Sequence, residues 1–151
     1  MEKIIKGVDY IGITVCFYCH DNNGNMLLQK RSSACRDEQG TWDCGGGSME
    51  FGETFEDAVR RELKEEYGAT PKSIRFCGVN NVLRKNRSKN THWIAIIFDV
   101  VVDPKQIVNN NPERIESLGW FTAEALPQPL HSMYLRHWLV VREKGTHDKD
   151  T

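Results

Sequence analysis

No stretch of this sequence approaches the roughly 20 consecutive apolar residues that a membrane-spanning helix requires. The longest apolar run, from Trp93 to Val102, is interrupted by Asp99 and has the length of a buried strand. The N-terminal segment Met-Glu-Lys-Ile-Ile-Lys-Gly lacks the apolar core of a signal peptide. We therefore expect a cytoplasmic protein with no membrane partner.

The sequence also lacks an excess of either charge. Lys and Arg together number 20 against 21 Asp and Glu, which gives a formal net charge of -1. Proteins that bind duplex DNA rely on a strongly basic surface, so DNA is not the expected partner. The sequence has one short basic cluster, Lys85, Arg87 and Lys89, so the end of an RNA chain is an alternative partner. A solvated hairpin tip also explains this cluster.

The sequence lacks the two cysteine pairs that a structural zinc site of the Cys₄ type needs. The chain has 5 cysteines, an odd number, and Cys16 and Cys19 have the spacing of a zinc or redox motif. They fall in a segment that resembles a strand, where residues three apart point to opposite faces. No second pair follows at finger spacing, so the sequence predicts reduced thiols without a shared metal.

The most informative stretch, Gly47 to Ala69, is a glycine-rich loop followed by a helix rich in carboxylates. Thr54 is placed to cap this helix, because its hydroxyl can accept a hydrogen bond from the backbone amide of Asp57. Gly68 is placed to end it in the left-handed conformation. The spacing thus predicts a helix between these two residues.

Three carboxylates share one narrow arc of this helix. At about 100° per residue, Glu65 lies roughly 60° to one side of Glu62 and Glu66 roughly 40° to the other. Such runs are most often solvated faces, but the flanking glycines Gly45 to Gly47 and Gly52 leave the backbone open to an ion or a phosphate. Oxygen ligands of this kind suit Mg²⁺, which takes one or two carboxylates together with substrate phosphates.

The spacing of the whole stretch resembles the signature of the Nudix hydrolases. The matching positions are Gly47, five residues, Glu53, seven residues, Arg61-Glu62-Leu63, one residue, Glu65-Glu66, one residue, Gly68. The following Ala69 stands where the family prefers a larger aliphatic residue. Trp42-Asp43-Cys44-Gly45-Gly46-Gly47 also resembles the family's Trp-x-Leu-Pro-Gly-Gly lead-in, with Gly45 in place of the usual proline. A motif of this length is specific.

The resemblance implies a set of metal ligands and a positioning residue. Divalent ions, Mg²⁺ or alternatively Mn²⁺, would be held by the Gly46 carbonyl and the carboxylates of Glu62, Glu65 and Glu66, with Glu53 as an outer ligand. Arg61 would hold a catalytic carboxylate in place by a bidentate pair, although an ordinary surface ion pair is the alternative.

The resemblance does not decide which residue is the general base that activates water. Family members use either the glutamate that matches Glu62 or an acid on a later loop, where Glu113 and Glu116 are candidates and Asp103 is a weaker one. The segment that starts at Asn111 resembles a Glu-Pro-x-Lys segment of nucleotide-hydrolysing members, with Asn111 in place of the leading Glu.

The rest of the chain alternates strands and helices irregularly. We expect strands at 9–19, 26–31, 73–83, 93–102 and 117–122, and a closing amphipathic helix from Leu130 to Val141. These elements predict a mixed sheet sandwiched between helices, of class α/β (α+β), which agrees with the α/β/α sandwich that the resemblance implies. We expect one Nudix domain over residues 1–145, followed by a polar, disordered tail at 146–151.

Markers of the known family subgroups bear on the choice of substrate. Subgroup markers of dinucleoside-polyphosphate and ADP-ribose hydrolases, a tyrosine and a proline, are missing from the segment Val82 to Ser88. The pattern is nearer to members that cleave nucleoside triphosphates to the monophosphate and pyrophosphate, with Arg31, Trp93 and Trp120 as candidate substrate-binding residues. Left open are an ADP-ribose or nucleotide-sugar pyrophosphatase, an RNA-end pyrophosphohydrolase, a non-catalytic ligand-binding module, and a homodimer.

Overall fold

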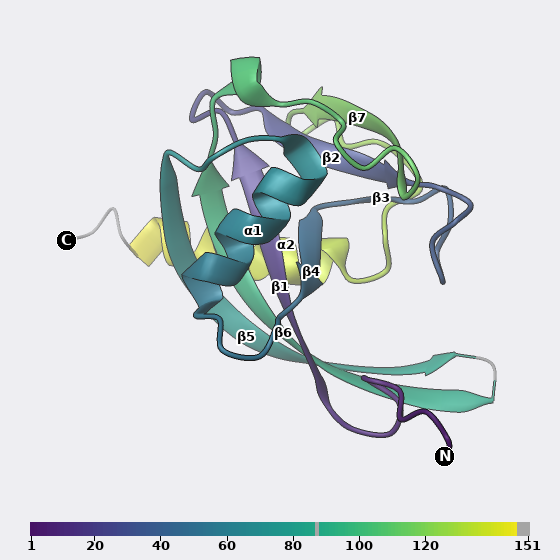
Figure 1. Ribbon diagram of the computed structural model, residues 1–151. Coiled ribbons are helices and arrows are strands. Elements are labelled where there is room, and N and C mark those ends of the chain that lie inside the picture. Colours follow the sequence, from purple (N-terminus) through teal and green to yellow (C-terminus); the bar gives the residue numbers. More distant parts are fainter. Residues whose placement is uncertain (87, 148–151) are drawn as a thin grey trace.

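The computed structural model describes residues 1–86 and 88–147 (Figure 1). Its strands are β1 (Gly12–His20), β2 (Met26–Arg31), β3 (Trp42–Asp43), β4 (Gly45–Ser48), β5 (Ser73–Asn86), β6 (Lys89–Val101) and β7 (Ile115–Phe121). Its α-helices are α1 (Phe55–Tyr67) and α2 (Tyr134–His147), and a short 3₁₀ helix covers Pro104–Gln106. No helix in this part of the chain is long and apolar enough to cross a membrane.

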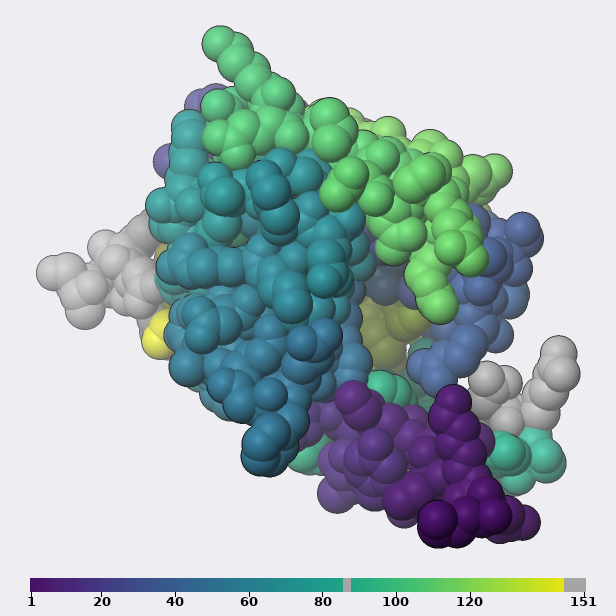
Figure 2. All heavy atoms as spheres, in the orientation of Figure 1, coloured from purple at the N-terminus to yellow at the C-terminus, as the bar shows by residue number. Residues whose placement is uncertain are grey.

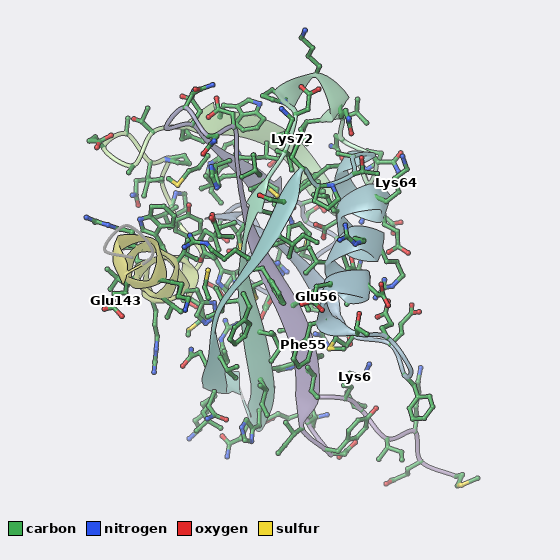
Figure 3. All side chains as sticks on the ribbon, turned by 90° about the vertical axis from the view of Figure 1, so that its left-hand side faces the viewer. Lys6, Phe55, Glu56, Lys64, Lys72 and Glu143 are labelled. Atoms are coloured by element: carbon green, nitrogen blue, oxygen red, sulfur yellow. The ribbon has the colours of Figure 1, made fainter. Side chains whose placement is uncertain are left out.

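The strands form one mixed sheet between the two α-helices. The order is β3-β2-β1-β6-β5, with β4 paired to β1 and β7 paired to β2. β1 and β6 run parallel, and the other pairs run antiparallel. Seen edge-on, the sheet carries α1 on one face and α2 on the other (Figure 3). The predicted α/β/α sandwich with a mixed sheet is therefore confirmed.

Both faces of β1 are buried, which explains why its sequence is apolar at both parities. Val15 and Phe17 belong to the core cluster under α1, whereas Tyr18 belongs to the cluster under α2. Cys19 lies in the first cluster and Cys16 packs against the second. The two thiols therefore point to opposite faces of the sheet, as predicted, and both are free cysteines.

β1 and β2 separate directly after their hairpin. The Asp21 carboxylate accepts hydrogen bonds from the amides of Asn23 and Asn25 and closes the turn. Over the described residues the two strands then share one paired position, His20 opposite Met26. Further along, β1 pairs with β4 and β2 pairs with β3. Beyond His20 and Met26, the sheet is thus divided between β1 and β2. This division leaves room for a cavity that reaches both faces of the sheet.

The structure moves several predicted boundaries. The stretch Gly45–Ser48, predicted as loop, is the strand β4, because its backbone pairs with β1. The closing helix begins at Tyr134 and not at Leu130, which instead bridges to Trp42. α2 continues through residue 147, so the first two residues of the predicted tail are helical. The rest of that tail, 148–151, and the candidate Arg87 lie outside the described residues.

Candidate active site

The helix α1 has the ends that its sequence predicts. The hydroxyl of Thr54 accepts a hydrogen bond from the Asp57 amide at 3.1 Å. Gly68 ends the helix with a φ of 66°, and its amide donates to the carbonyl of Lys64. These two caps fix which residues lie on the helix, and the packing of Val59 and Leu63 against the sheet fixes its rotation.

This rotation separates the three carboxylates of the arc. Glu66 is buried, with 8% of its surface exposed, and the side chain of Glu62 is 14% exposed. The side chain of Glu65 is 58% exposed. Glu62 and Glu66 line a cavity, whereas Glu65 does not. Helical spacing alone predicts the same role for Glu62, Glu65 and Glu66. The structure places only Glu62 and Glu66 at the cavity.

Arg61 connects four groups around these acids. Its Nε and Nη2 donate to the two carboxylate oxygens of Glu53 at 2.7 and 2.9 Å, which is a bidentate pair. Its Nη1 donates to Oε1 of Glu62 at 2.8 Å and to Oε2 of Glu65 at 3.3 Å. Its Nη2 also donates to the Ser48 carbonyl at 3.1 Å. The guanidinium thereby joins α1 to the end of β4 and lowers the pKa of Glu53 to about 2.

Glycines let β4 approach the acidic face of α1 closely. A Cβ at Gly47 would lie 2.1 Å from Cδ of Glu62, so a side chain there displaces that carboxylate. The Gly46 amide donates to Oε2 of Glu66 at 3.4 Å. Because Met49 donates its amide to the Ile13 carbonyl, the alternation of an antiparallel ladder directs the Gly46 amide and carbonyl away from β1. The Gly46 carbonyl therefore lies on the strand edge that meets Glu66.

The two buried carboxylates fit a divalent cation. Burial raises the pKa of Glu66 well above its usual range, and the charge of Glu62 adds to this effect. Burial also raises the pKa of Glu62, although the Arg61 hydrogen bond opposes the shift. A cation beside both would relieve these costs. No group of three His, Cys, Asp or Glu residues in the described parts of the chain forms a metal cage. Glu62 and Glu66 supply carboxylate oxygens, the ligand type that Mg²⁺ takes together with waters and substrate phosphates.

A cavity of about 1100 Å³ extends from these carboxylates through the division of the sheet to the α2 side. Figure 2 shows the hollow between α1 (blue to teal), the loop after β2 (blue) and the N-terminal segment (purple), with atoms near the start of α2 (olive) at its floor. This volume is at the upper end for small-molecule sites and accommodates a nucleotide.

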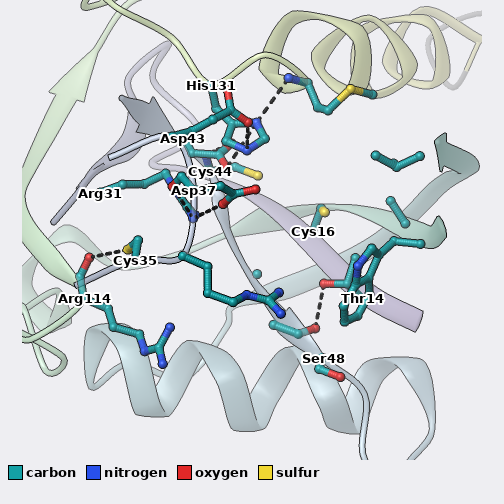
Figure 4. Close-up of a pocket in the computed structure, with 18 of the residues that line it drawn as sticks. Thr14, Cys16, Arg31, Cys35, Asp37, Asp43, Cys44, Ser48, Arg114 and His131 are labelled. Carbon is teal, nitrogen blue, oxygen red and sulfur yellow. Dashed lines mark hydrogen bonds and ion pairs between the residues drawn. The ribbon is translucent and has the colours of Figure 1, made fainter. Parts of the chain in front are cut away.

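Cationic side chains line the cavity, and they differ in their partners. Arg31 donates to Oδ1 of Asp37 at 2.8 Å and to the Asp37 carbonyl, so it holds the loop after β2 (Figure 4). Arg36 and Arg114 also line the cavity and are exposed, and the structure gives neither guanidinium an ion pair among the described residues. No local pattern in the sequence marks these two residues as cavity-lining.

The loop of Arg114 is tied to the loop of Arg36 by backbone contacts. The Ser32 amide donates to the Arg114 carbonyl at 2.9 Å, and the Cys35 thiol donates to the same carbonyl at 3.3 Å. The Ser32 hydroxyl donates to the Glu113 carbonyl. These bonds join segments about 80 residues apart, and they bring Arg36 and Arg114 to one cavity wall.

The acids predicted on the later loop stay outside this cavity. Glu113 and Glu116 are exposed, and Oε2 of Glu116 pairs with Nζ of Lys30 at 3.3 Å. Neither lines the cavity, whereas Asn111 does. The Asp103 carboxylate caps the short 3₁₀ helix by accepting from the Lys105 amide. The structure thus does not bring the later-loop acids to Glu62.

Trp93 and Trp120, the two aromatic residues predicted to contact the substrate, differ in their position relative to the cavity. Trp93 lines the cavity, and the backbone of Gly7 and Gly12 packs against its ring so closely that a Cβ at either position would overlap it. Trp120 packs against the core cluster under α1 and does not line the cavity. The structure thus brings Trp93 to the cavity and places Trp120 outside it.

The far end of the cavity, on the α2 side, carries a second polar group. Asp43, Cys44 and His131 lie there, opposite α1 (Figure 4). The Cys44 amide donates to Oδ1 of Asp43 at 2.8 Å. His131 donates from Nε2 to Glu38 at 2.7 Å and accepts at Nδ1 from the Met133 amide at 3.1 Å.

An α/β/α sandwich whose capped acidic helix faces a nucleotide-sized cavity places the chain in the class of Nudix domains. A sequence model described as the NUDIX domain matches residues 11–143, so the chain belongs to the Nudix family. The family and the hydrolase class predicted from the signature are thereby confirmed.

Named relatives and a solved structure agree with this assignment. The chain is 27% identical over 137 residues to the mouse protein named 8-oxo-dGDP phosphatase NUDT18, covering 89% of this chain but 39% of that relative. It is 32% identical over 112 residues to the nucleoside triphosphatase NudI of Enterobacter sp. (strain 638), covering 70% of this chain and 78% of the relative. It resembles the MutT NUDIX hydrolase structure from Burkholderia pseudomallei with a TM-score of 0.77 and 27% identity, over 87% of this chain and 98% of the other.

Proposed function

We propose that this chain is a Mg²⁺-dependent hydrolase of a phosphoanhydride in a nucleotide, foremost a nucleoside triphosphate cleaved to the monophosphate and pyrophosphate. Mn²⁺ is the expected substitute metal. The observation that carries the proposal is the pair of buried carboxylates, Glu62 and Glu66, at the wall of a cavity that the guanidinium groups of Arg36 and Arg114 also line. The name of the NudI relative, a nucleoside triphosphatase, supports the choice of substrate.

In this mechanism a bound Mg²⁺, held by Glu62, Glu66 and the Gly46 carbonyl, would supply charge neutralisation and a more acidic water. Arg61 fixes Oε1 of Glu62, which leaves Oε2 to accept the proton of the attacking water. Glu62 is the better candidate for the base because Glu113 and Glu116 lie outside the cavity.

Arg36 and Arg114 are the groups we assign to the phosphates. Guanidinium groups pair with phosphate oxygens in a fork geometry, and those of Arg36 and Arg114 have no competing carboxylate in the described structure. Arg31 has a different role here, because its ion pair with Asp37 shapes the loop that carries Arg36.

One competing substrate class is a nucleoside diphosphate, which the name of the mouse relative favours. The chain spans well under half the length of that relative, so its substrate is a candidate only. ADP-ribose, nucleotide sugars and triphosphorylated RNA ends share the same cleaved linkage and belong in the same comparison. A ligand-binding module without activity is the outcome if none of them is cleaved.

A substrate panel with identified products tests the proposal. Nucleoside triphosphates, diphosphates, ADP-ribose, a nucleotide sugar and triphosphorylated RNA are compared by kcat/KM with Mg²⁺ and with EDTA, and released phosphate and pyrophosphate are measured separately. We expect triphosphates to lead, with pyrophosphate as the product and no turnover in EDTA. A tenfold lead for another substrate, about 1.4 kcal/mol in transition-state binding, overturns the substrate while leaving the metal chemistry intact.

Substitution of the two arginines tests the phosphate assignment. Hydrogen bonds to charged groups contribute about 1.5 to 3 kcal/mol, so Arg36→Ala and Arg114→Ala should each lower kcat/KM by at least about tenfold. Arg60→Ala is the matched control, because Arg60 is exposed on α1 and does not line the cavity. Equal kinetics for the three variants would remove Arg36 and Arg114 from the binding site.

A further inference from the structure

The α2-side end of the cavity holds a carboxylate that hydrolysis does not use. Asp43 ends β3, lines the cavity, and has a side chain that is 18% exposed. Its Oδ1 accepts the Cys44 amide, and a carboxylate oxygen can accept a second hydrogen bond. Burial raises the pKa of Asp43, while His131 and the Cys44 amide oppose the shift.

The neighbouring histidine, His131, does not donate a hydrogen bond to the Asp43 carboxylate. Nδ1 of His131 lies 3.8 Å from Oδ2 of Asp43, beyond hydrogen-bond length. The Met133 amide donates to Nδ1, and Nε2 lies 2.7 Å from Oε2 of Glu38, so both ring nitrogens have partners other than Asp43. Oδ2 therefore keeps acceptor capacity toward the cavity.

The other acid groups of this wall are already paired. Glu38 accepts from Arg84, from His131 and from both the amide and the hydroxyl of Ser132. Asp37 pairs with Arg31 through Oδ1 and with Arg84 through Oδ2. Asp43 differs from Glu38 and Asp37 in that neither of its carboxylate oxygens accepts a hydrogen bond from an arginine or histidine among the described residues.

The surroundings of Asp43 suit a flat heterocycle. Trp93, Val82 and Ala95 line the α2 side of the same cavity, as does Met133. The helix α1, which carries Glu62 and Glu66, lies at the opposite end of the cavity (Figure 4). A nucleotide with its phosphates at Glu62 and Glu66 would therefore carry its base toward Asp43.

Resting on the proposed function, we infer that Asp43 reads the nucleobase, and that it selects a purine with two adjacent N–H donors, the N1–H and the 2-amino group of guanine. A carboxylate accepts two such donors side by side, and one of its oxygens is left unpaired when the 2-amino group is absent. Adenine presents an acceptor at N1, and uracil offers one donor between two carbonyls. Neither offers this pair.

The test removes one hydrogen-bonding group on each side of the contact. Inosine triphosphate differs from guanosine triphosphate by the missing 2-amino group, and Asp43→Asn replaces one acceptor oxygen by an amide donor. We expect the unmodified protein to bind the guanine nucleotide at least about tenfold more tightly, and Asp43→Asn to reduce this ratio to about twofold or less. Dissociation constants are measured calorimetrically with Ca²⁺ in place of Mg²⁺, so that the result does not depend on turnover.

Asp37→Asn is the matched control for cavity charge. It removes the same charge from the same wall, but Asp37 is already bound to two arginines, so the guanine-to-inosine ratio should stay at its original value. A second comparison needs no variant: 1-methylguanosine triphosphate should bind weakly, whereas the 7-deaza analogue, altered on the opposite edge, should bind as guanosine triphosphate does.

The outcomes separate this inference from the proposed function. A ratio near one in the unmodified protein, or a ratio that Asp43→Asn leaves intact, overturns the base assignment even if triphosphates are hydrolysed. A guanine preference that depends on Asp43 in a protein without hydrolytic activity sustains the assignment and overturns the proposed reaction.

Discussion

Replacing Glu66 by glutamine tests whether a buried carboxylate is retained for metal binding at the expense of stability. Glu66 is 8% exposed, and the hydrogen bond that it accepts from the Gly46 amide is long, at 3.4 Å. Leaving a buried polar group poorly satisfied costs about 1 to 3 kcal/mol, and more for a charged one. In the metal-free protein the ionised carboxylate should therefore oppose folding by at least this amount.

Glutamine keeps the volume and removes the charge. We expect metal-free Glu66→Gln to be more stable than the unmodified protein by about 1 to 3 kcal/mol, or about 2 to 4 °C in Tm for each kcal/mol in a domain of this size. Thermal and urea unfolding in EDTA measure this difference. Mg²⁺ at about 1,000 times its Kd should reverse the order, because it adds about 4.1 kcal/mol to the protein that binds it, and the variant lacks one ligand.

The pH dependence of the difference follows from the direction of the pKa shift. The pKa of Glu66 is raised in the folded state, and an unfolded glutamate has a pKa of about 4.3. Below that pH the group is protonated in both states, so the penalty is absent. As the pH rises toward and through the folded pKa, the unfolded chain releases its proton more readily and the folded protein loses stability. The advantage of Glu66→Gln should grow over this range.

Glu65→Gln is the matched control on the same helix. Its side chain is 58% exposed, so its Tm in EDTA should stay within about 1 °C of the unmodified protein. If Glu65→Gln and Glu66→Gln have the same Tm in EDTA between pH 4 and pH 8, the buried charge carries no cost and the reasoning is refuted.

Three further substitutions probe other contacts. Gly47→Ala should lower kcat/KM at least about tenfold in a steady-state assay, because the added Cβ displaces the Glu62 carboxylate; full activity would contradict the close packing of β4 on α1. Tyr67→Phe should lower the free energy of unfolding by about 1 to 3 kcal/mol in urea, since it leaves the buried Gln29 carbonyl without the hydroxyl that donates to it. Glu116→Gln should keep kcat/KM within about twofold, and a large loss would restore the later-loop acid as the base.

The parts of the site that the sequence predicts are those set by local spacing. The caps at Thr54 and Gly68 and the arc of Glu62 and Glu66 depend on helical geometry alone, and the structure has them as expected. The unequal burial of Glu65 and Glu66 was not predictable in this way, because it depends on where β4 crosses the helix. Glycine has no side chain to mark a face, so β4 itself gave no periodic signal.

The cavity walls depend on contacts between distant segments. Arg36 and Arg114 meet at one wall because the loops that carry them are hydrogen-bonded through the Arg114 carbonyl, and no local pattern encodes that contact. Asp43 had one usable signal, its place two residues before the first glycine of the signature's lead-in. Trp120 illustrates the opposite error, since an aromatic residue near a motif is as readily part of the core.

The division of the sheet between β1 and β2 has a practical consequence for laboratory evolution. The acids that would carry out hydrolysis lie on α1, whereas the residues near Asp43 lie on β3 and on the segment before α2. A library confined to Asp43, His131 and Met133 would vary the α2 end of the cavity without altering a side chain that contacts Arg61. Selection for new nucleobase preferences can therefore begin there, with the acids of α1 held constant throughout.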